Sequence, residues 1–220
     1  MKRIAFLIVT VCCLFTACNT SAPQSETVAQ TETSAASVTV SPMAETIDPE
    51  HPDNCTLAVS LKEGDAYVDD TGAMQMKVTV YTYDRYDMVD IAAMKEGDTL
   101  IIGGQEVVVT SVTRDDFGAV LINGGMDAGG YELRTQEDGC FHEVLPNDDR
   151  AYYPLGEAVI RVSADFVYTD SSDPEAGDVT YYPGDFLVEG TGIDYYFTPY
   201  NTSIVIENGQ VVAMTRVFHP

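Results

Sequence analysis

Over most of its length the chain alternates apolar and polar residues, and this pattern restricts its fold more than any other feature. Leu57, Val59 and Leu61 alternate with small or polar neighbours, and residues 74–81 do the same. A period of two places successive side chains on opposite faces of a β-strand. Turn-forming residues, such as those at 69–72 (DDTG), separate the runs. The sequence therefore predicts a series of short, half-buried strands.

Further strand candidates follow with turn signals every ~8–12 residues, a spacing typical of β-sandwiches and barrels. They cover residues 99–102, 105–112, 119–122, 131–134, 140–144, 157–163, 165–168, 179–182, 186–188, 195–198, 203–207 and 210–218, the last two joined by Asn208-Gly209. One helix is expected at residues 87–94, capped by Asp87 and stopped by Gly97. We therefore expect residues 55–220 to form a mainly β domain, a single β-sandwich or partly open barrel with one short helix.

The N-terminus has the layout of a secretion signal. Lys2 and Arg3 give a positive start, and residues 4–15 form an almost unbroken apolar run that leads toward Cys18. This run is shorter than the ~20 residues that span a bilayer. The sequence therefore predicts a signal peptide over residues 1–17.

Residues 14–18 (LFTAC) resemble the lipobox of bacterial lipoprotein precursors. In that family the thiol of the final cysteine receives a diacylglyceryl group, and a dedicated peptidase cuts just before it. The resemblance implies that Cys18 is lipidated and that the protein is anchored in the cell membrane, facing outside the cytoplasm. Phe15 departs from the usual Leu, Val or Ile at its position, and the alternative is a plain secretory signal with a chance cysteine.

Residues 18–54 are expected to be the lipidated N-terminus and a flexible linker. This stretch is dominated by Ser, Thr, Ala, Glu and Gln, contains four prolines and lacks a sustained periodicity. Such a composition buries too little apolar surface to offset the conformational entropy that folding costs.

The charge of the chain is strongly negative, with a net of −24. Two of the 11 basic residues, Lys2 and Arg3, lie in the predicted signal peptide, which leaves nine against 35 acidic residues, a net of −26. Nucleic-acid binding needs a basic surface, so the composition argues against that class of partner. The predicted partners are the membrane, through the lipid, and an unidentified surface protein or glycan.

Two cysteines remain outside the signal peptide and the anchor. Cys55 and Cys140 are the only cysteines of the predicted domain. Outside the cytoplasm two such residues can form a disulfide. The sequence leaves open whether they form this bridge or remain free thiols.

The sequence contains no familiar catalytic motif. It has no Gly-x-Ser-x-Gly elbow, no Cys-x-x-Cys, no His-Glu-x-x-His and no Walker loop. His142 is the one histidine well inside the predicted domain that a Ser- or Cys-based triad would need. The simpler interpretation is a partly exposed histidine in a strand.

An acidic loop follows the candidate strand at residues 165–168. Its carboxylates are Asp170, Asp173, Glu175 and Asp178. Ca²⁺ takes 6–8 oxygen ligands, so this loop is a candidate calcium site, although its spacing does not match an EF-hand. The alternative is a solvated acidic loop, and no other cofactor is indicated.

Tyrosine is unusually frequent, with 13 residues in a chain that has no Trp. Three doublets stand out: Tyr152-Tyr153, Tyr181-Tyr182 and Tyr195-Tyr196. Because neighbours in a strand point to opposite faces, each doublet is expected to place one ring inward and one outward. The outward rings form a candidate binding surface for sugar or protein, although tyrosine also suits the exposed face of any sheet.

These features favour a lipid-anchored, extracytoplasmic binding or interaction module without a catalytic site. The alternative is a carboxylate-based cell-surface hydrolase that acts on a glycan or wall polymer. Such an enzyme needs two carboxyl groups at a defined separation, one as the acid and one as the base or nucleophile. A cleft with two such carboxylates would favour the hydrolase, and a tyrosine-lined face would favour the binding module.

Overall fold

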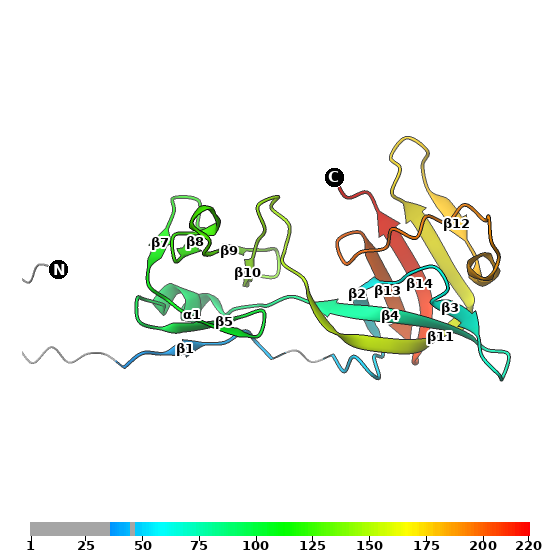
Figure 1. Cartoon of the computed structure of the whole chain (residues 1–220), viewed down its shortest axis with the longest axis horizontal. Helices are drawn as coiled ribbons and strands as arrows, with labels where there is room; N and C mark the ends of the chain where they lie inside the picture. The colour runs from blue at the N-terminus through cyan, green and yellow to red at the C-terminus, as the bar shows by residue number, and fades with distance from the viewer. Residues whose placement is uncertain (1–35, 45–46) are drawn as a thin grey trace, which may run out of the picture. The chain divides into compact units, whose positions relative to one another are not determined.

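The computed structural model describes residues 36–44 and 47–220 (Figure 1). Strands make up 44% and helices 8%, which confirms the prediction of a mainly β chain with one short α-helix. The predicted signal peptide and the lipidation site Cys18 lie outside the described residues. Within the described part, no helix combines the length and the apolar character needed to cross a bilayer.

Five strands form a partly closed barrel (Figure 1). They are β2 (Cys55–Ser60), β4 (Met74–Thr82), β11 (Tyr153–Ser171), β13 (Thr202–Glu207) and β14 (Gln210–Val217). The ladders run β2–β4–β11–β14–β13 and return to β2, and the β11–β14 pair alone is parallel among these five. This is the connectivity of the five-stranded Greek-key barrel called the OB-fold. The predicted partly open barrel is confirmed, and β3 (Ala66–Val68) and β12 (Val179–Tyr181) extend its sheet.

The strand β11 is 19 residues long and serves two sides of the barrel. Its first half pairs with β4 and its second half with β14, and the register shifts between Val162 and Val167. The sequence predicted two strands here, at 157–163 and 165–168. The irregularity interrupts the alternation of apolar residues, so one bent strand resembles two short ones.

The barrel core follows the alternation of its strands. In β4, Met76, Val78 and Val80 are buried, and the residues between them are partly exposed. Phe166 and Tyr168 of β11 meet Phe186, with ring centroids 5.8 and 5.6 Å apart. The core is therefore aliphatic along β4 and aromatic toward the end of β11.

Two predicted strands near the aromatic part of the core are wrong. Phe186 lies in a 3₁₀ helix, η2 (Pro183–Leu187), and residues 195–198 form no strand. A proline begins η2, and the Asp185 carboxylate accepts the Tyr182 N–H at 2.7 Å, which fixes the first turn. A short apolar run does not distinguish a strand from a helical turn by its pattern alone.

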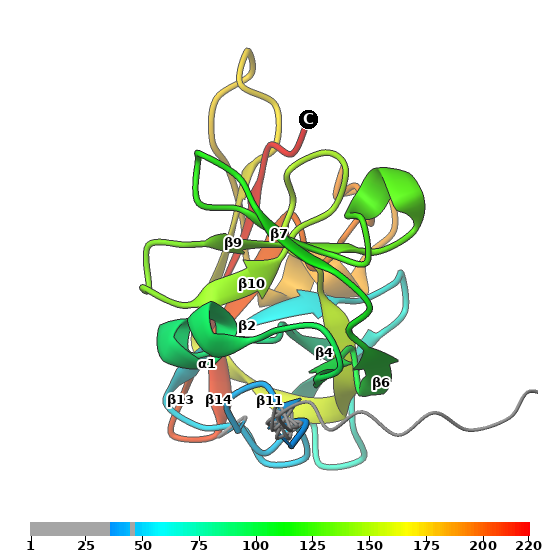
Figure 2. The ribbon, with the colours of Figure 1, turned by 90° about the vertical axis from the view of Figure 1, so that its left-hand side faces the viewer.

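Residues 83–152 form an insertion between β4 and β11 with a separate core. Its elements are α1 (Met88–Ala93), β5 (Thr99–Ile102), β6 (Gln105–Val108), β7 (Val112–Arg114), β8 (Val120–Ile122), η1 (Met126–Ala128), β9 (Tyr131–Thr135) and β10 (Phe141–Glu143). In Figure 2, α1 lies near β10, and a bridge between Tyr86 and Phe141 links the two regions. Both residues belong to a hydrophobic cluster distinct from the barrel core. The predicted single domain thus has two cores.

The helix α1 begins where the sequence predicted. The Asp87 side chain accepts the N–H of Val89 at 2.7 Å, which confirms the cap. At the other end Arg114 donates to the carbonyl oxygens of Ile91 and Ala92, at 2.7 and 3.1 Å. These contacts satisfy main-chain groups that a helix of six residues leaves unpaired.

The folded unit begins at Ala36, inside the segment predicted to be a linker. Thr39 and Val40 form β1, which pairs in parallel with β5. Val40 is buried, and the Asp98 carboxylate accepts the N–H of Val38 at 2.9 Å. The Ser- and Thr-rich composition hides this strand because a single buried valine gives no periodicity.

Candidate binding site: a groove lined by tyrosine rings

The segment between η2 and β13 is held as a defined turn by one buried side chain. Asn201 is 7% exposed. Its side-chain amide oxygen accepts the Thr198 N–H at 2.9 Å and the Thr202 hydroxyl at 2.6 Å. Its amide nitrogen donates to the Tyr196 carbonyl at 3.0 Å. These three bonds fix residues 196–202 and thereby the positions of the rings they carry.

Arg216 of β14 anchors the start of the same segment. Its guanidinium donates to the Asp194 carbonyl oxygen, and it lies 3.1 Å from the Asp194 carboxylate. It also donates to the Ser172 hydroxyl at 2.6 Å. Because the Arg216 side chain is 8% exposed, these contacts tie the segment to the barrel wall through a buried charge.

A chain of aromatic rings runs beside this segment. Tyr83 contacts His142 and Tyr152, with ring centroids 5.0 and 5.7 Å apart. Tyr152 contacts Tyr200 at 5.3 Å, and Tyr200 contacts His219 at 5.5 Å. The first three of these contacts are edge-to-face, an arrangement that aromatic pairs favour. The rings therefore support one another as a rigid wall.

A cavity of about 630 Å³ opens against this wall. We call it the tyrosine groove, defined by four rings: Tyr81, Tyr152, Tyr196 and Tyr200. The other lining residues are Leu145, Asn147, Asp149, Thr198, Pro199, Asn201, His219 and Pro220. The lining contains no Lys or Arg and a single carboxylate side chain, that of Asp149. Aromatic faces and neutral hydrogen-bonding groups therefore make up most of its surface.

The one carboxylate side chain that lines the tyrosine groove, Asp149, is already paired. Asp149 Oδ1 lies 2.9 Å from His219 Nε2, and the Asn147 amide donates to the other carboxylate oxygen. Both side chains are half-buried, with 23% of Asp149 and 27% of His219 exposed. The carboxylate is thus held in place by its neighbours.

The phenols of Tyr152 and Tyr200 are neutral hydrogen-bonding groups. Burial raises the pKa of Tyr152 and of Tyr200 above the ordinary value. Both hydroxyl groups therefore keep their protons at neutral pH and present an apolar ring with a polar tip.

The structure brings two of the six predicted tyrosines into the groove, Tyr152 and Tyr196. The Tyr153 hydroxyl donates to Glu143 in the insertion. Tyr181 stacks on Tyr168, with centroids 5.4 Å apart, and Tyr195 packs against Phe197 at 5.7 Å. Tyr182 is 60% exposed and lies outside the groove lining. Sequence analysis missed Tyr81 and Tyr200, which share no local motif with the doublets.

Cys55 and Cys140 are free cysteines in the structure, so it does not form the bridge that the sequence left open. Cys55 lies in β2 and pairs with Ile206 of the barrel. Cys140 precedes β10 in the insertion. One cysteine thus lies in the barrel and the other in the insertion, which their separation in the sequence alone does not indicate.

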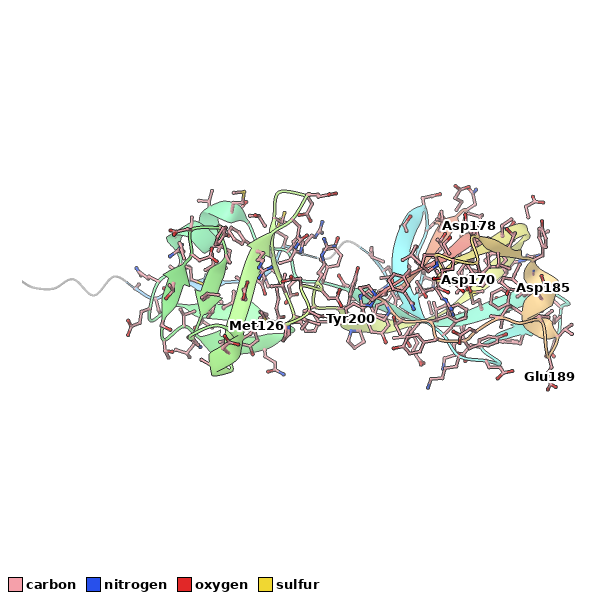
Figure 3. All side chains as sticks on the ribbon, turned by 90° about the horizontal axis from the view of Figure 1, so that it is seen from above. Met126, Asp170, Asp178, Asp185, Glu189 and Tyr200 are labelled. Carbon is pink, nitrogen blue, oxygen red and sulfur yellow. The ribbon has the colours of Figure 1, made fainter. Side chains whose placement is uncertain are left out.

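The predicted calcium ligands do not form a shared site. Asp170 lies 3.3 Å from Arg216 Nε, and Asp173 accepts the N–H groups of Glu175 and Ala176 within its own turn. Asp178 lies at the end of that loop (Figure 3). Across residues 36–44 and 47–220, no group of three or more acidic, His or Cys side chains is arranged to hold a metal ion. Asp170 instead forms an ion pair with Arg216.

His142 is fully buried in β10 and has both ring nitrogens engaged. Nδ1 lies 3.0 Å from the Asp84 carbonyl oxygen, and Nε2 lies 2.9 Å from the Asp138 carboxylate. Both partners are oxygen acceptors, so neither nitrogen is placed to take a proton from a nucleophile. The strand position agrees with the simpler interpretation of the sequence, but the expected partial exposure is wrong, because the neighbouring groups bury the ring completely.

Two carboxylates in the insertion, Asp84 and Glu143, lie close enough for their charges to interact. Burial raises the pKa of Glu143, and the charge of Asp84 adds to this effect. Asp84 accepts the Gly103 N–H at 2.7 Å, and Glu143 accepts the Tyr153 hydroxyl. Neither carboxylate is among the lining residues of the tyrosine groove.

Comparison of the chain with protein-family models, with curated proteins and with solved structures finds no match in any of the three. A barrel of OB connectivity hosts many functions. Function therefore has to be argued from the chemistry of the groove and of the N-terminal sequence.

Proposed function

We propose that the chain is a lipid-anchored protein facing outside the cytoplasm, whose tyrosine groove binds a neutral carbohydrate without transforming it. One observation carries the binding part. A cavity of about 630 Å³ is lined by four tyrosine rings and by no Lys or Arg. Cavities of ~300–1,000 Å³ are the usual size of small-ligand sites.

The chemistry of the groove suits a sugar ring. A pyranose has apolar C–H faces and polar edges, and tyrosine offers an apolar ring with a hydroxyl tip. Tyr196 is 70% exposed and presents a free face, while Tyr152 and Tyr200 are braced by their neighbours. The groove thus combines a stacking surface with hydrogen-bonding side chains.

The charge of the protein narrows the ligand class. The net charge of −24 repels nucleic acids and other polyanions. The lining of the groove offers no fixed cation to offset this repulsion. A neutral ligand is not repelled by the net charge and needs no cation in the groove to offset such repulsion.

The hydrolase alternative is less favoured because Asp149 is the only Asp or Glu side chain among the lining residues of the groove. Hydrolysis of a glycosidic bond by the usual mechanism needs two carboxyl groups on either side of the bond. We expect no new reducing ends when the protein is incubated with an oligosaccharide that it binds. Release of reducing ends by the protein would support the hydrolase.

Binding is tested by calorimetry with the full chain, purified in mild detergent, against a panel of neutral oligosaccharides. Tyr196→Ala should weaken binding of the best ligand at least tenfold, since exposed aromatic anchors often dominate an interface. Tyr182→Ala is the matched control, because Tyr182 is 60% exposed but lies outside the groove. Equal affinity of the two variants, or no binding to any sugar, would contradict the proposal.

The anchor is tested separately in cells fed a clickable fatty acid. Lipidation at Cys18 predicts a labelled band that the Cys18→Ser variant loses. Stable membrane attachment needs more than one acyl chain, since each buried CH₂ contributes ~0.8 kcal/mol. Label that persists in Cys18→Ser would refute this part and leave the groove untouched.

A further inference from the structure

Two further hollows share lining residues with the tyrosine groove. A hollow of about 390 Å³ shares Tyr196 and Thr198 with it, and another of about 300 Å³ shares Tyr152 and Tyr200. We infer that the site takes an internal stretch of a linear, neutral polysaccharide several sugar units long. This inference rests on the proposed carbohydrate binding and specifies the form of the ligand.

The smaller hollow extends the groove over the outer faces of β2, β13 and β14. Its floor carries the hydroxyl side chains Thr56, Ser203 and Thr215. Ser203 faces Thr215 across the β13–β14 ladder, so these hydroxyl groups form a neighbouring pair. A surface of neutral donors and acceptors matches the hydroxyl groups along the edge of a sugar chain.

The larger hollow extends the groove in another direction, over β4 and β11. It contains Lys62 and Lys77 together with Asp65 and Glu157, so its charges balance. Lys77 Nζ lies 3.1 Å from the Glu157 carboxylate. Because the positive and negative side chains are equal in number, this hollow does not attract an acidic polymer. In Figure 3, Tyr200 lies well apart from the acidic end of the barrel around Asp185 and Glu189.

An extended peptide fits this surface less well than a glycan. Peptides that lie along a sheet gain most of their affinity by pairing with a free strand edge. The hollows lie over β2, β4, β11, β13 and β14, and each of these strands is paired on both sides within the barrel circuit. A ligand bound over these strands therefore meets side chains and not an unpaired strand edge. This arrangement favours recognition of hydroxyl groups and sugar ring faces.

The inference predicts that affinity depends on chain length. With the full chain and the sugar that binds best, the Kd should fall at least tenfold from the disaccharide to the hexasaccharide and then level off. Thr56→Arg should fill the smaller hollow and weaken the hexasaccharide at least fivefold, with little change for the disaccharide. Thr113→Arg, on an exposed position of β7 in the insertion, is the matched control and should leave both affinities unchanged.

The outcomes separate the two proposals. Binding that is independent of chain length, or equal hexasaccharide affinity for Thr56→Arg and the control, would overturn the extended site and leave the sugar site standing. No binding of any oligosaccharide would overturn both. Capture of extended peptides from a random library, without glycan binding, would also overturn both. Circular dichroism of each variant establishes that the fold is retained, since Thr56 is an exposed position.

Discussion

Replacing Arg216 by Met should destabilise the barrel more than any single change at an exposed ion pair. The Arg216 side chain is 8% exposed, and its Nε lies 3.3 Å from Asp170 Oδ1. The Asp170 side chain is itself 12% exposed, so water does not replace the lost cation. Asp194, the other carboxylate partner, is 66% exposed and contributes little.

The expected magnitude follows from the burial of the pair. Removal of one partner of a buried ion pair costs about 3–5 kcal/mol, because the other charge stays in a poorly solvated place. For a chain of this size each kcal/mol shifts Tm by ~2–4 °C. We therefore expect Arg216→Met to lower Tm by about 6–20 °C. Asp170→Asn in the same chain should restore part of the loss, since it removes the orphaned charge.

The assay is urea unfolding followed by far-UV circular dichroism. Lys77→Met is the control, because its pair with Glu157 has 44% and 65% of the side chains exposed. Exposed pairs contribute ~0–1 kcal/mol. A loss of less than 1 kcal/mol for Arg216→Met, or one no larger than for the control, would refute the reasoning.

The same pair makes stability depend on pH in a defined direction. Burial acts to raise the pKa of Asp170, but hydrogen bonds from Ser172 and the charge of Arg216 outweigh it and lower the pKa. A carboxyl whose pKa is lower in the folded state stabilises the fold above its unfolded pKa of ~3.9. That stabilisation is lost as the pH falls below this value. Arg216→Met should flatten the acid limb of the stability profile.

Three further predictions test other parts of the fold. Gly130→Ala should cost about 1–3 kcal/mol in a urea titration, because its Cβ would lie 2.0 Å from a main-chain oxygen, whereas Gly184→Ala has open space and should be neutral. Phe166→Ala, buried in the barrel core, should cost about 3–5 kcal/mol by the same titration. The hydrogen bond from Thr71 is the main cause that lowers the pKa of Asp69 to about 2. In an NMR titration Thr71→Val should move that pKa back toward 3.8, and an unchanged value would refute the assignment.

Local sequence patterns predicted the elements that are determined by interactions between neighbouring residues. The alternation in β4 placed Met76, Val78 and Val80 inside the barrel. The pair Asn208-Gly209 predicted the turn between β13 and β14, and both residues have positive φ, at 51° and 69°. Each of these features is decided by a few adjacent residues, so the sequence shows it directly.

The insertion and the groove could not be predicted in the same way. Thr82 and Tyr153 face each other across the β4–β11 ladder, although the whole insertion lies between them in the sequence. The residues near positions 82 and 153 give no local signal of this pairing. Tyr81 and Tyr200 are distant in the chain, and they meet only because the barrel closes. Tyrosine doublets were a local signal, and the structure uses just one ring from each of two doublets to line the groove.

The placement of the groove follows from the way the insertion joins the barrel. The chain leaves the barrel beyond Tyr81 and returns through Tyr152, and the β4–β11 ladder holds these exits together by pairing Tyr81 with Pro154. Tyr83 and Tyr152 lie on the two connections and contact each other. The rings that contact each other at the two connections therefore include a ring that lines the groove. A ligand stacked on Tyr152 would contact the same residue that packs against Tyr83 where the insertion joins β4 and β11.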